Sequence, residues 1–491
     1  MNQAPTSQAE TGSLSLQRLS LLLLAGAGLG VGLAELTFVH SPLSLAGAVV
    51  LVIIAAALYT RVLGARVGLL ALLVVTCLLD RFTFPLGRVG IRSEQLAALI
   101  GLGAIGFWIL SRRRGWDLVR PSPIEALLGL WFALSLVSSL AFAPDTSRSV
   151  KAVALLLISS LGLLLPRRLL NPLPRQGEAA RSAGGGTPNE LDFVTKIFLV
   201  AIAAEGVYGT GAFLAHIFGP TLSLNPNPAT GHLSAYGTLW EPNVFGAFCA
   251  AGAVAWLWLG RRHFSHPWIG ITACLGGTLV SFTRAAWVTA LFVLAISAAG
   301  PLRKRADLRQ LALGVAGAAV IALALYGAEH VADYYPRIAG APPTNPSSRG
   351  LPTLLTNAID VIGRLDQVPI VLNDLGPRLL LGNGTASYGV RHPIAGQPEQ
   401  HIANLELTVL NDTGIVGLLV FLAFGGCLAY AVWRRRDDPT VAGLSVAALV
   451  IVITNTATET TELMITWLML GLVVMAVDAS TKRLSQRPDE T

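Results

Sequence analysis

Arg284 is the residue whose position most strongly suggests chemistry. It lies in SFTRAAWVTAL, where one apolar run ends and the next begins. An arginine at membrane depth costs at least a few kcal/mol unless it is paired or meets water, so it marks a functional site by default. Its guanidinium keeps its charge and matches phosphate oxygens, which suits an outward-facing Arg284 to a pyrophosphate. The alternative is a helix-end arginine that reaches back to the interface.

His401 stands near the end of a long polar interval, just before another apolar run. An imidazole titrates near neutrality, so it could take a proton from a sugar hydroxyl as that hydroxyl attacks an activated anomeric carbon. An interfacial histidine without a chemical role is the alternative. The neighbouring His392, Glu399, Glu406 and Asp412 lack metal-ligand spacing, so we expect no metal site.

The polar interval also contains IDVIGRLDQVPIVLNDLGPRLLLGNG, in which Arg364 lies. Apolar residues recur there at helical spacing: Val361, Ile362, Leu365, Val368 and Leu372. This predicts an amphipathic helix on the outer leaflet. Arg364 either serves the site or forms a salt bridge with Asp360 or Asp366. The other arginines of the interval are interpreted as solvated or lipid-facing: Arg337, Arg349, Arg378 and Arg391.

Gly382 and Gly384 belong to GNGTASYG, which superficially resembles a dinucleotide-binding fingerprint. No buried strand precedes it, so we reject that interpretation. The glycines instead predict a tight turn with a close backbone approach, a phosphate nest being the alternative.

Two further outward turns carry polar groups. TGHLSAYGTLWEPNVFGAF contains His232, Glu241 and Asn243, and the proline between the last two predicts a helix start at Asn243. NTATETTELMITW contains Glu459 and Glu462, which could pair with an arginine or transfer a proton.

Composition identifies the elements that must position these residues. Of 491 residues, 53% are hydrophobic and 13% charged, as expected of a polytopic membrane protein. The net charge of +7 comes from short basic clusters between apolar runs, which indicates membrane topology and no nucleic-acid partner. The four cysteines lie inside apolar runs without metal-ligand spacing.

The fold class predicted is an all-α polytopic membrane protein with about 12–14 transmembrane helices and a large periplasmic loop. The predicted organisation is a tail (1–18), an N-terminal bundle (19–166), a cytoplasmic loop (167–192), a central bundle (193–327), a large outward loop (328–404), C-terminal spans (405–480) and a second tail (481–491). Basic clusters fall on one side of fourteen candidate spans, and that side is assigned to the cytoplasm with both termini.

Four segments in order, LWEPNVFGAF, SFTRAAW, GRLDQVPIVLNDLGPRLLLGNGTASYG and NLELTVLNDTGIVGLLVF, resemble the O-antigen ligase and polymerase superfamily of bacterial envelope glycan transferases. The resemblance covers about residues 231–470. It implies a glycosyltransferase C-like enzyme of the bacterial inner membrane, independent of metal and cofactors. Such enzymes transfer a glycan from undecaprenyl diphosphate to a lipid A core sugar, as ligases do, or to a second lipid-linked glycan, as polymerases do.

By this resemblance Arg284 and Arg364 would bind the diphosphate and His401 would activate the acceptor hydroxyl. Residues in supporting positions are Asn404, Asn243, His232, Gly382 and Gly384. The chain departs from the family pattern at Ala403, where the family commonly has histidine, so that His401 is displaced by two residues. His232 stands near a second position where members often have arginine. Both departures favour a polymerase or divergent member over a ligase.

The sequence leaves two alternatives to a glycan transferase, each from another functional class of protein. One is a transporter of an anionic solute, which predicts broken helices around a site near the bilayer midplane. The other is a noncatalytic scaffold of an envelope assembly complex.

Overall fold

The chain folds into helices wherever the sequence is continuously apolar. The computed structural model describes residues 16–38, 42–86, 89–111, 121–170, 188–215, 224–226, 233–239, 241–299, 305–338, 367–393, 401–456, 458 and 460–485. The apolar helices are α1 (Leu16–Phe38), α2 (Pro42–Leu63), α3 (Ala65–Cys77), α4 (Ser93–Ser111), α5 (Pro123–Phe142), α6 (Thr146–Leu170), α7 (Pro188–Ala215), α8 (Pro242–His263), α9 (Pro267–Val280), α10 (Arg284–Ala299), α11 (Arg305–Ile338), α16 (Leu405–Trp433), α17 (Pro439–Asn455) and α18 (Met464–Ser485).

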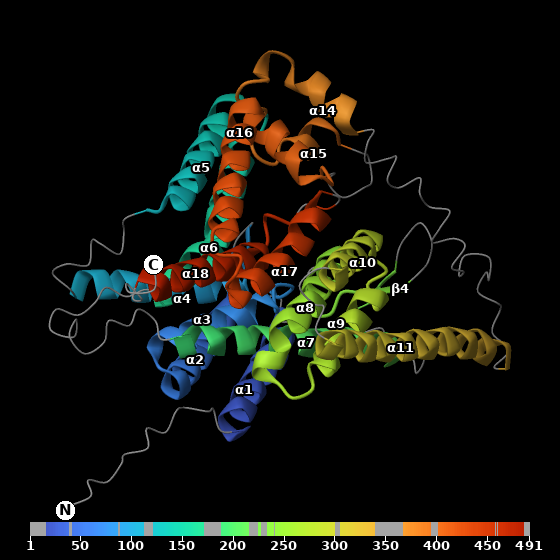
Figure 1. Cartoon of the computed structure of the whole chain (residues 1–491). Coiled ribbons are helices and arrows are strands. Elements are labelled where there is room, and N and C mark those ends of the chain that lie inside the picture. Colours follow the sequence, from blue (N-terminus) through green and yellow to red (C-terminus); the bar gives the residue numbers. More distant parts are fainter. Residues whose placement is uncertain are drawn as a thin grey trace, which may run out of the picture.

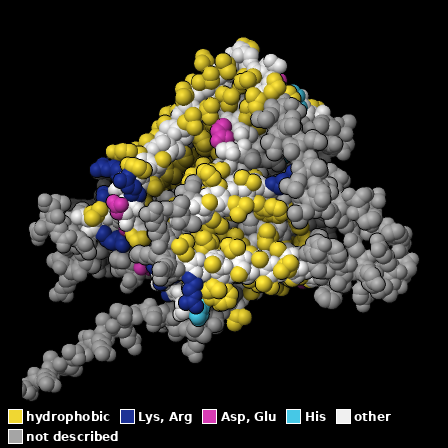
Figure 2. Space-filling model, turned by 45° about the vertical axis from the view of Figure 1, so that its right-hand side comes forward, with side chains coloured by type: hydrophobic (Ala, Val, Ile, Leu, Met, Phe, Trp, Pro, Cys, Tyr) yellow, Lys and Arg dark blue, Asp and Glu magenta, His cyan; other side chains and the backbone are white. Residues whose placement is uncertain are grey.

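Each of the fourteen predicted apolar segments corresponds to one of these helices. Within the described ranges, nine helices are long and apolar enough to cross a membrane, and shorter apolar helices occupy the remaining segments. Hydrophobic side chains predominate on the face in Figure 2, where Lys and Arg form small groups. The all-α polytopic membrane class is therefore confirmed.

Small elements complete the described fold (Figure 1). Two antiparallel hairpins are formed by β1 (Thr83–Leu86) with β2 (Val89–Arg92), and by β3 (Leu224–Pro226) with β4 (Leu233–Ala235). The short helices α14 (Gln367–Leu375), η4 (Gly376–Arg378) and α15 (Tyr388–Arg391) belong to the predicted outward loop. Helix α11 enters that loop as far as Ile338, so the loop begins with helix where connecting chain was expected.

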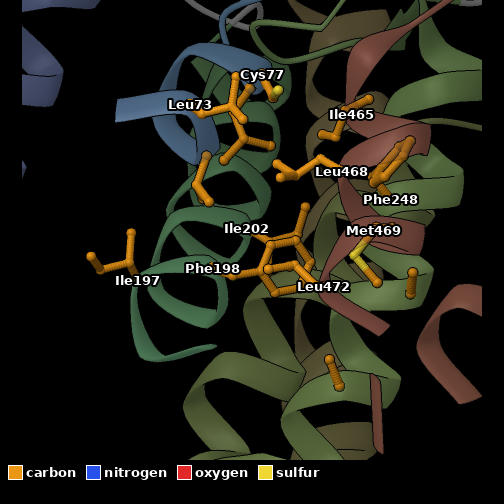
Figure 3. Close-up of a cluster of buried hydrophobic side chains, with 14 of the residues drawn as sticks. Leu73, Cys77, Ile197, Phe198, Ile202, Phe248, Ile465, Leu468, Met469 and Leu472 are labelled. Atoms are coloured by element: carbon orange, nitrogen blue, oxygen red, sulfur yellow. The ribbon is translucent and has the colours of Figure 1, made fainter. Parts of the chain in front are cut away.

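The core lies where α8 and α18 meet α3 and α7. Figure 3 shows side chains from these four helices in contact, among them Phe198, Phe248 and Leu468. Almost all of α8 is buried, as expected of a helix that is apolar on every side. Helices α9 and α10 both pack along α8, so the residues at the start of α8 are held by the turn between them.

Ion pairs join the helices at the end of the bundle where the sequence has its basic clusters. Glu125 accepts hydrogen bonds from Arg167 and Arg168 at 2.7 Å each, and Arg167 also bonds Asp478 at 2.7 Å. Arg483 pairs with Asp438. These contacts tie α5, α6 and α18 together, and α18 to the start of α17, at the end predicted to face the cytoplasm.

Helix α16 packs against α5 and is broken at Gly414, whose backbone angles are φ 66° and ψ −170°. In Figure 1 these two helices stand side by side, with α14 and α15 at one end of the pair. We call α14, η4 and α15, with the connecting residues 379–387, the outward layer. It covers the break in α16.

Candidate functional site

Four segments that are far apart in the sequence meet in one pocket of about 230 Å3, at the end of the bundle predicted to face outward. They are the end of β2, the start of α8, the residues before α16 and the turn between α17 and α18. The lining residues are Arg92, Glu241, Asn243, Val244, His401, Ile402, Ala403, Thr458, Thr460, Glu462 and Leu463. The pocket therefore combines one guanidinium, one imidazole, two carboxyl groups and a carboxamide.

His401 reaches the pocket because residues 401–404 are irregular rather than helical. Gln367 of α14 fixes this segment, since its side chain donates to the carbonyl of His401 and accepts from the amide of Ala403, both at 3.2 Å. Asn404 then starts α16 by accepting from the amide of Leu407 at 2.7 Å. The irregular backbone allows His401, two residues before Ala403, to line the pocket.

Asn404 has a structural task that local sequence reasoning did not assign. Besides capping α16, its side chain donates to the carbonyl of Thr456 at 2.7 Å. This bond ties the start of α16 to the end of α17, which precedes the turn that supplies Thr458, Thr460 and Glu462 to the pocket. One side chain thus joins two walls of the site.

The start of α8 supplies Glu241 and Asn243, and α8 begins at Pro242, one residue before the helix start predicted at Asn243. The hydroxyl of Thr283 donates to the carbonyl of Pro242 at 2.9 Å and lies 3.4 Å from Oδ1 of Asn243. Thr283 immediately precedes Arg284, the first residue of α10. The predicted arginine thus lies one residue from a contact of the pocket wall, although Arg284 itself is not a lining residue.

The turn that presents Arg284 has an uncommon backbone. Phe282 adopts φ 52°, in the left-handed region that is unfavourable for a non-glycine residue. The hydroxyl of Ser281 accepts from the amide of Thr283 at 3.2 Å, and the indole of Trp287 donates to the carbonyl of Thr278 at 2.7 Å. Several bonds therefore hold a conformation that costs of order 1–3 kcal/mol.

Arg92 is a charged lining residue that was not identified from the sequence. It ends β2, and its amide donates to Oε1 of Gln95 at 3.1 Å. The sequence does contain a signal that could have identified it. Arg81, Arg88 and Arg92 cluster in a turn assigned to the outward side, where basic residues are not expected.

Gly382 and Gly384 serve the break in α16 rather than the pocket lining. A Cβ on Gly382 would lie 2.6 Å from the carbonyl oxygen of Asp412, and one on Gly384 would lie 2.7 Å from Cβ of Ala143. The predicted tight turn with close backbone approach is confirmed. The amides of Asn383 and Gly384 donate to the carbonyls of Asn411 and Asp412, which the break leaves without their usual helical donors.

Some of the remaining predicted residues line the pocket, and others lie where the structure is not described. Arg364, His232 and Glu459 lie outside the described residues, and Arg337 belongs to α11 in a part where only the helix is described. The carboxyl groups of Glu241 and Glu462 share the pocket with His401. Among the described residues there is no group of three or more His, Cys, Asp or Glu that could hold a metal ion.

The break in α16 lies close to the start of the helix at Leu405. Residues 415–433 continue beyond it as 19 helical residues, about 28 Å long, which is sufficient to span the hydrocarbon core. A transporter site was expected at broken helices near the midplane, whereas this break lies near the first residue of a long helix.

No protein-family model matches this chain, and no curated protein matches it in sequence. The pocket and its surroundings therefore provide the evidence for function.

Proposed function

We propose that this chain transfers a polysaccharide or repeat unit from undecaprenyl diphosphate to a sugar hydroxyl at the periplasmic face of the bacterial inner membrane. The observation that carries the proposal is the convergence of His401, Glu241 and Glu462 in one outward pocket. An imidazole beside carboxylates is suited to removing a proton from an attacking hydroxyl.

Charge divides the site into an acceptor part and a donor part. The pocket has two carboxyl groups, Glu241 and Glu462, against the single guanidinium of Arg92. With these groups ionised and the imidazole neutral its net charge is −1. A diphosphate is poorly suited to such a pocket, whereas sugar hydroxyls can donate to its carboxylates. We therefore assign the pocket to the acceptor, with His401 as the base and Glu241 orienting the hydroxyl.

The donor requires positive charge next to this pocket. Arg284 begins α10 beside the Thr283 contact to Asn243, where a helix N-terminus adds partial positive charge. Together with Arg364, it would hold the diphosphate while negative charge develops on the leaving group. No metal is needed in this scheme, because fixed guanidinium groups supply the stabilisation.

The proposal is tested by comparing acceptor-side and donor-side variants of the full-length protein with a lipid-linked glycan as substrate. His401→Ala is expected to lower kcat by about 10²–10⁴-fold, the usual contribution of a positioned base. Arg284→Ala and Arg364→Ala are expected to raise KM for the donor and to lower kcat. His266→Ala is the matched control, because His266 is exposed at the other end of the bundle.

If the rate of glycan transfer is unchanged in both arginine variants, the proposal that this chain is a glycan transferase is contradicted. If only His401→Ala is unchanged, the base is a different residue, and Glu241→Gln becomes the decisive variant. The acceptor separates the two members of the superfamily: transfer to a lipid A core sugar identifies a ligase, and growth of the lipid-linked chain identifies a polymerase.

A further inference from the structure

The outward layer contains a second group of charged residues, away from the residues that line the pocket. Arg378 ends η4, and Arg391 with His392 ends α15. Nε2 of His392 lies 2.5 Å from Oδ2 of Asp374, and the imidazole lies against the ring of Tyr388 with centroids 4.8 Å apart. The carboxylate of Asp374 therefore already has a partner.

The two arginines are incompletely satisfied by these neighbours. Nη1 of Arg378 has a long contact of 3.5 Å to Oδ1 of Asn383, and Nε of Arg391 is buried without a hydrogen-bond partner among the described residues. Burial and the charge of Arg378 lower the pKa of Arg391, while Asp374 opposes this. Two positive charges thus lie close to one acid that is shared with a histidine.

The position of this group relative to the bilayer follows from α16. The amides of Ile415 and Val416 donate to the carbonyls of Leu379 and Leu380, at 2.9 and 3.2 Å. Residues 415–433 have the length of a membrane span, so these bonds place the two leucines at its outward boundary. Arg378 is next in the chain and therefore lies at the level of lipid headgroups.

The opposite end of the same span supports this register. Cζ of Arg436 lies 4.0 Å from the ring centroid of Trp433, and Arg434 lies 5.9 Å from that of Tyr430. Aromatic and basic residues together are typical of a membrane interface. The span is thus bracketed by interface residues at both ends.

Apolar side chains near Arg378 in the chain and on α16 are exposed. Leu380 is 64% exposed and Leu419 on α16 is 60% exposed. On α14, Val368 and Leu372 are exposed while Val371 and Leu375 are buried. Val368 and Leu372 are the described members of the stripe that the sequence predicts on the outer leaflet, and both are exposed. The residues of α14 that pack on the protein belong to a different stripe.

We propose that Arg378 and Arg391 bind the phosphate of an anionic phospholipid of the outer leaflet, with Leu379, Leu380 and the exposed face of α14 in contact with its acyl chains. Guanidinium groups bind phosphate through paired hydrogen bonds, and anionic lipid supplies the charge that Asp374 does not. The lipid would fix the outward layer against the bilayer and, through Gln367, the segment that contains His401. This site would hold a lipid whether or not the pocket transfers glycans.

The test is native mass spectrometry of the full-length protein in detergent micelles doped with phosphatidylglycerol or phosphatidylcholine. Wild type is expected to retain phosphatidylglycerol in preference to phosphatidylcholine. The double variant Arg378→Ala/Arg391→Ala is expected to bind phosphatidylglycerol about thirtyfold more weakly, the factor for two arginines that each contribute about 1 kcal/mol near anionic lipid.

The matched control is Arg148→Ala/Lys151→Ala, which removes the same charge from the outward end of α6. It is expected to bind phosphatidylglycerol within twofold of wild type. Equal weakening in both double variants would overturn the proposal by showing a nonspecific charge effect. Equal retention of the two lipids by wild type would also overturn it, without requiring any variant to fold. Displacement of the lipid by millimolar inorganic phosphate would show a free-anion site and reject the lipid.

Discussion

Gly414→Ala should release the outward layer from α16. The residue has φ 66° and ψ −170°, a conformation essentially confined to glycine. A Cβ there would lie 2.4 Å from the carbonyl carbon and oxygen of Leu380, which are backbone atoms and cannot rotate away. The break and the layer that covers it must therefore move apart.

The magnitude follows from the contacts that would be lost. Forcing the backbone angles costs about 1–3 kcal/mol. The two hydrogen bonds from Ile415 and Val416 to the layer contribute about 0.5–1.5 kcal/mol each. The sum is about 2–6 kcal/mol, and its lower limit already increases local opening by roughly thirtyfold.

Hydrogen exchange of peptides covering residues 379–387 measures this opening directly. The control is Gly425→Ala in the same helix, where an added Cβ meets nothing within 4 Å. It is expected to leave exchange unchanged. Equal protection of residues 379–387 in the two variants would refute the role given to Gly414.

Two further predictions concern the ends of the bundle. Glu125→Gln removes the charged acceptor of two arginines of α6, at a side chain that is only 5% exposed. The free energy of unfolding measured in a denaturation assay should therefore fall by about 2–3 kcal/mol. Glu35→Gln, at an exposed position, is the control. Burial and the charge of Asp374 raise the pKa of Tyr388 above its ordinary value, so the folded layer favours the neutral phenol. Its stabilisation should be complete below about pH 10 and decline as the pH rises through the higher folded pKa, and Tyr388→Phe should abolish that decline in protease-protection assays.

Membrane-spanning helices were predictable because a long apolar run has few alternatives in a bilayer. The sequence also indicated the close approach at Gly382 and, to within one residue, the start of α8, since both depend on local backbone chemistry. The predicted span began at Ile415, whereas α16 begins ten residues earlier, at Leu405. Residues 405–414 are too polar to be predicted as part of a membrane span. Their helix is stabilised by the Asn404 cap and by tertiary contacts instead.

The pocket was only partly predictable for a similar reason. His401 and Asn243 were identified by residue type, but Arg92 joins them through a hairpin whose short strands leave no periodic signal. Which outward turns meet is decided by packing between helices distant in sequence. Local pattern alone does not contain that information.

The pairing of α5 with α16 has a consequence for biosynthesis. The hydroxyl of Ser138 donates to the carbonyl of Asp412, 274 positions later in the chain. At about 5–20 residues per second, roughly 14–55 s of translation separate the two partners. During that interval the hydroxyl of Ser138 lacks its partner on α16, so α5 depends on other contacts, such as those with α6, until residues 405–433 are made.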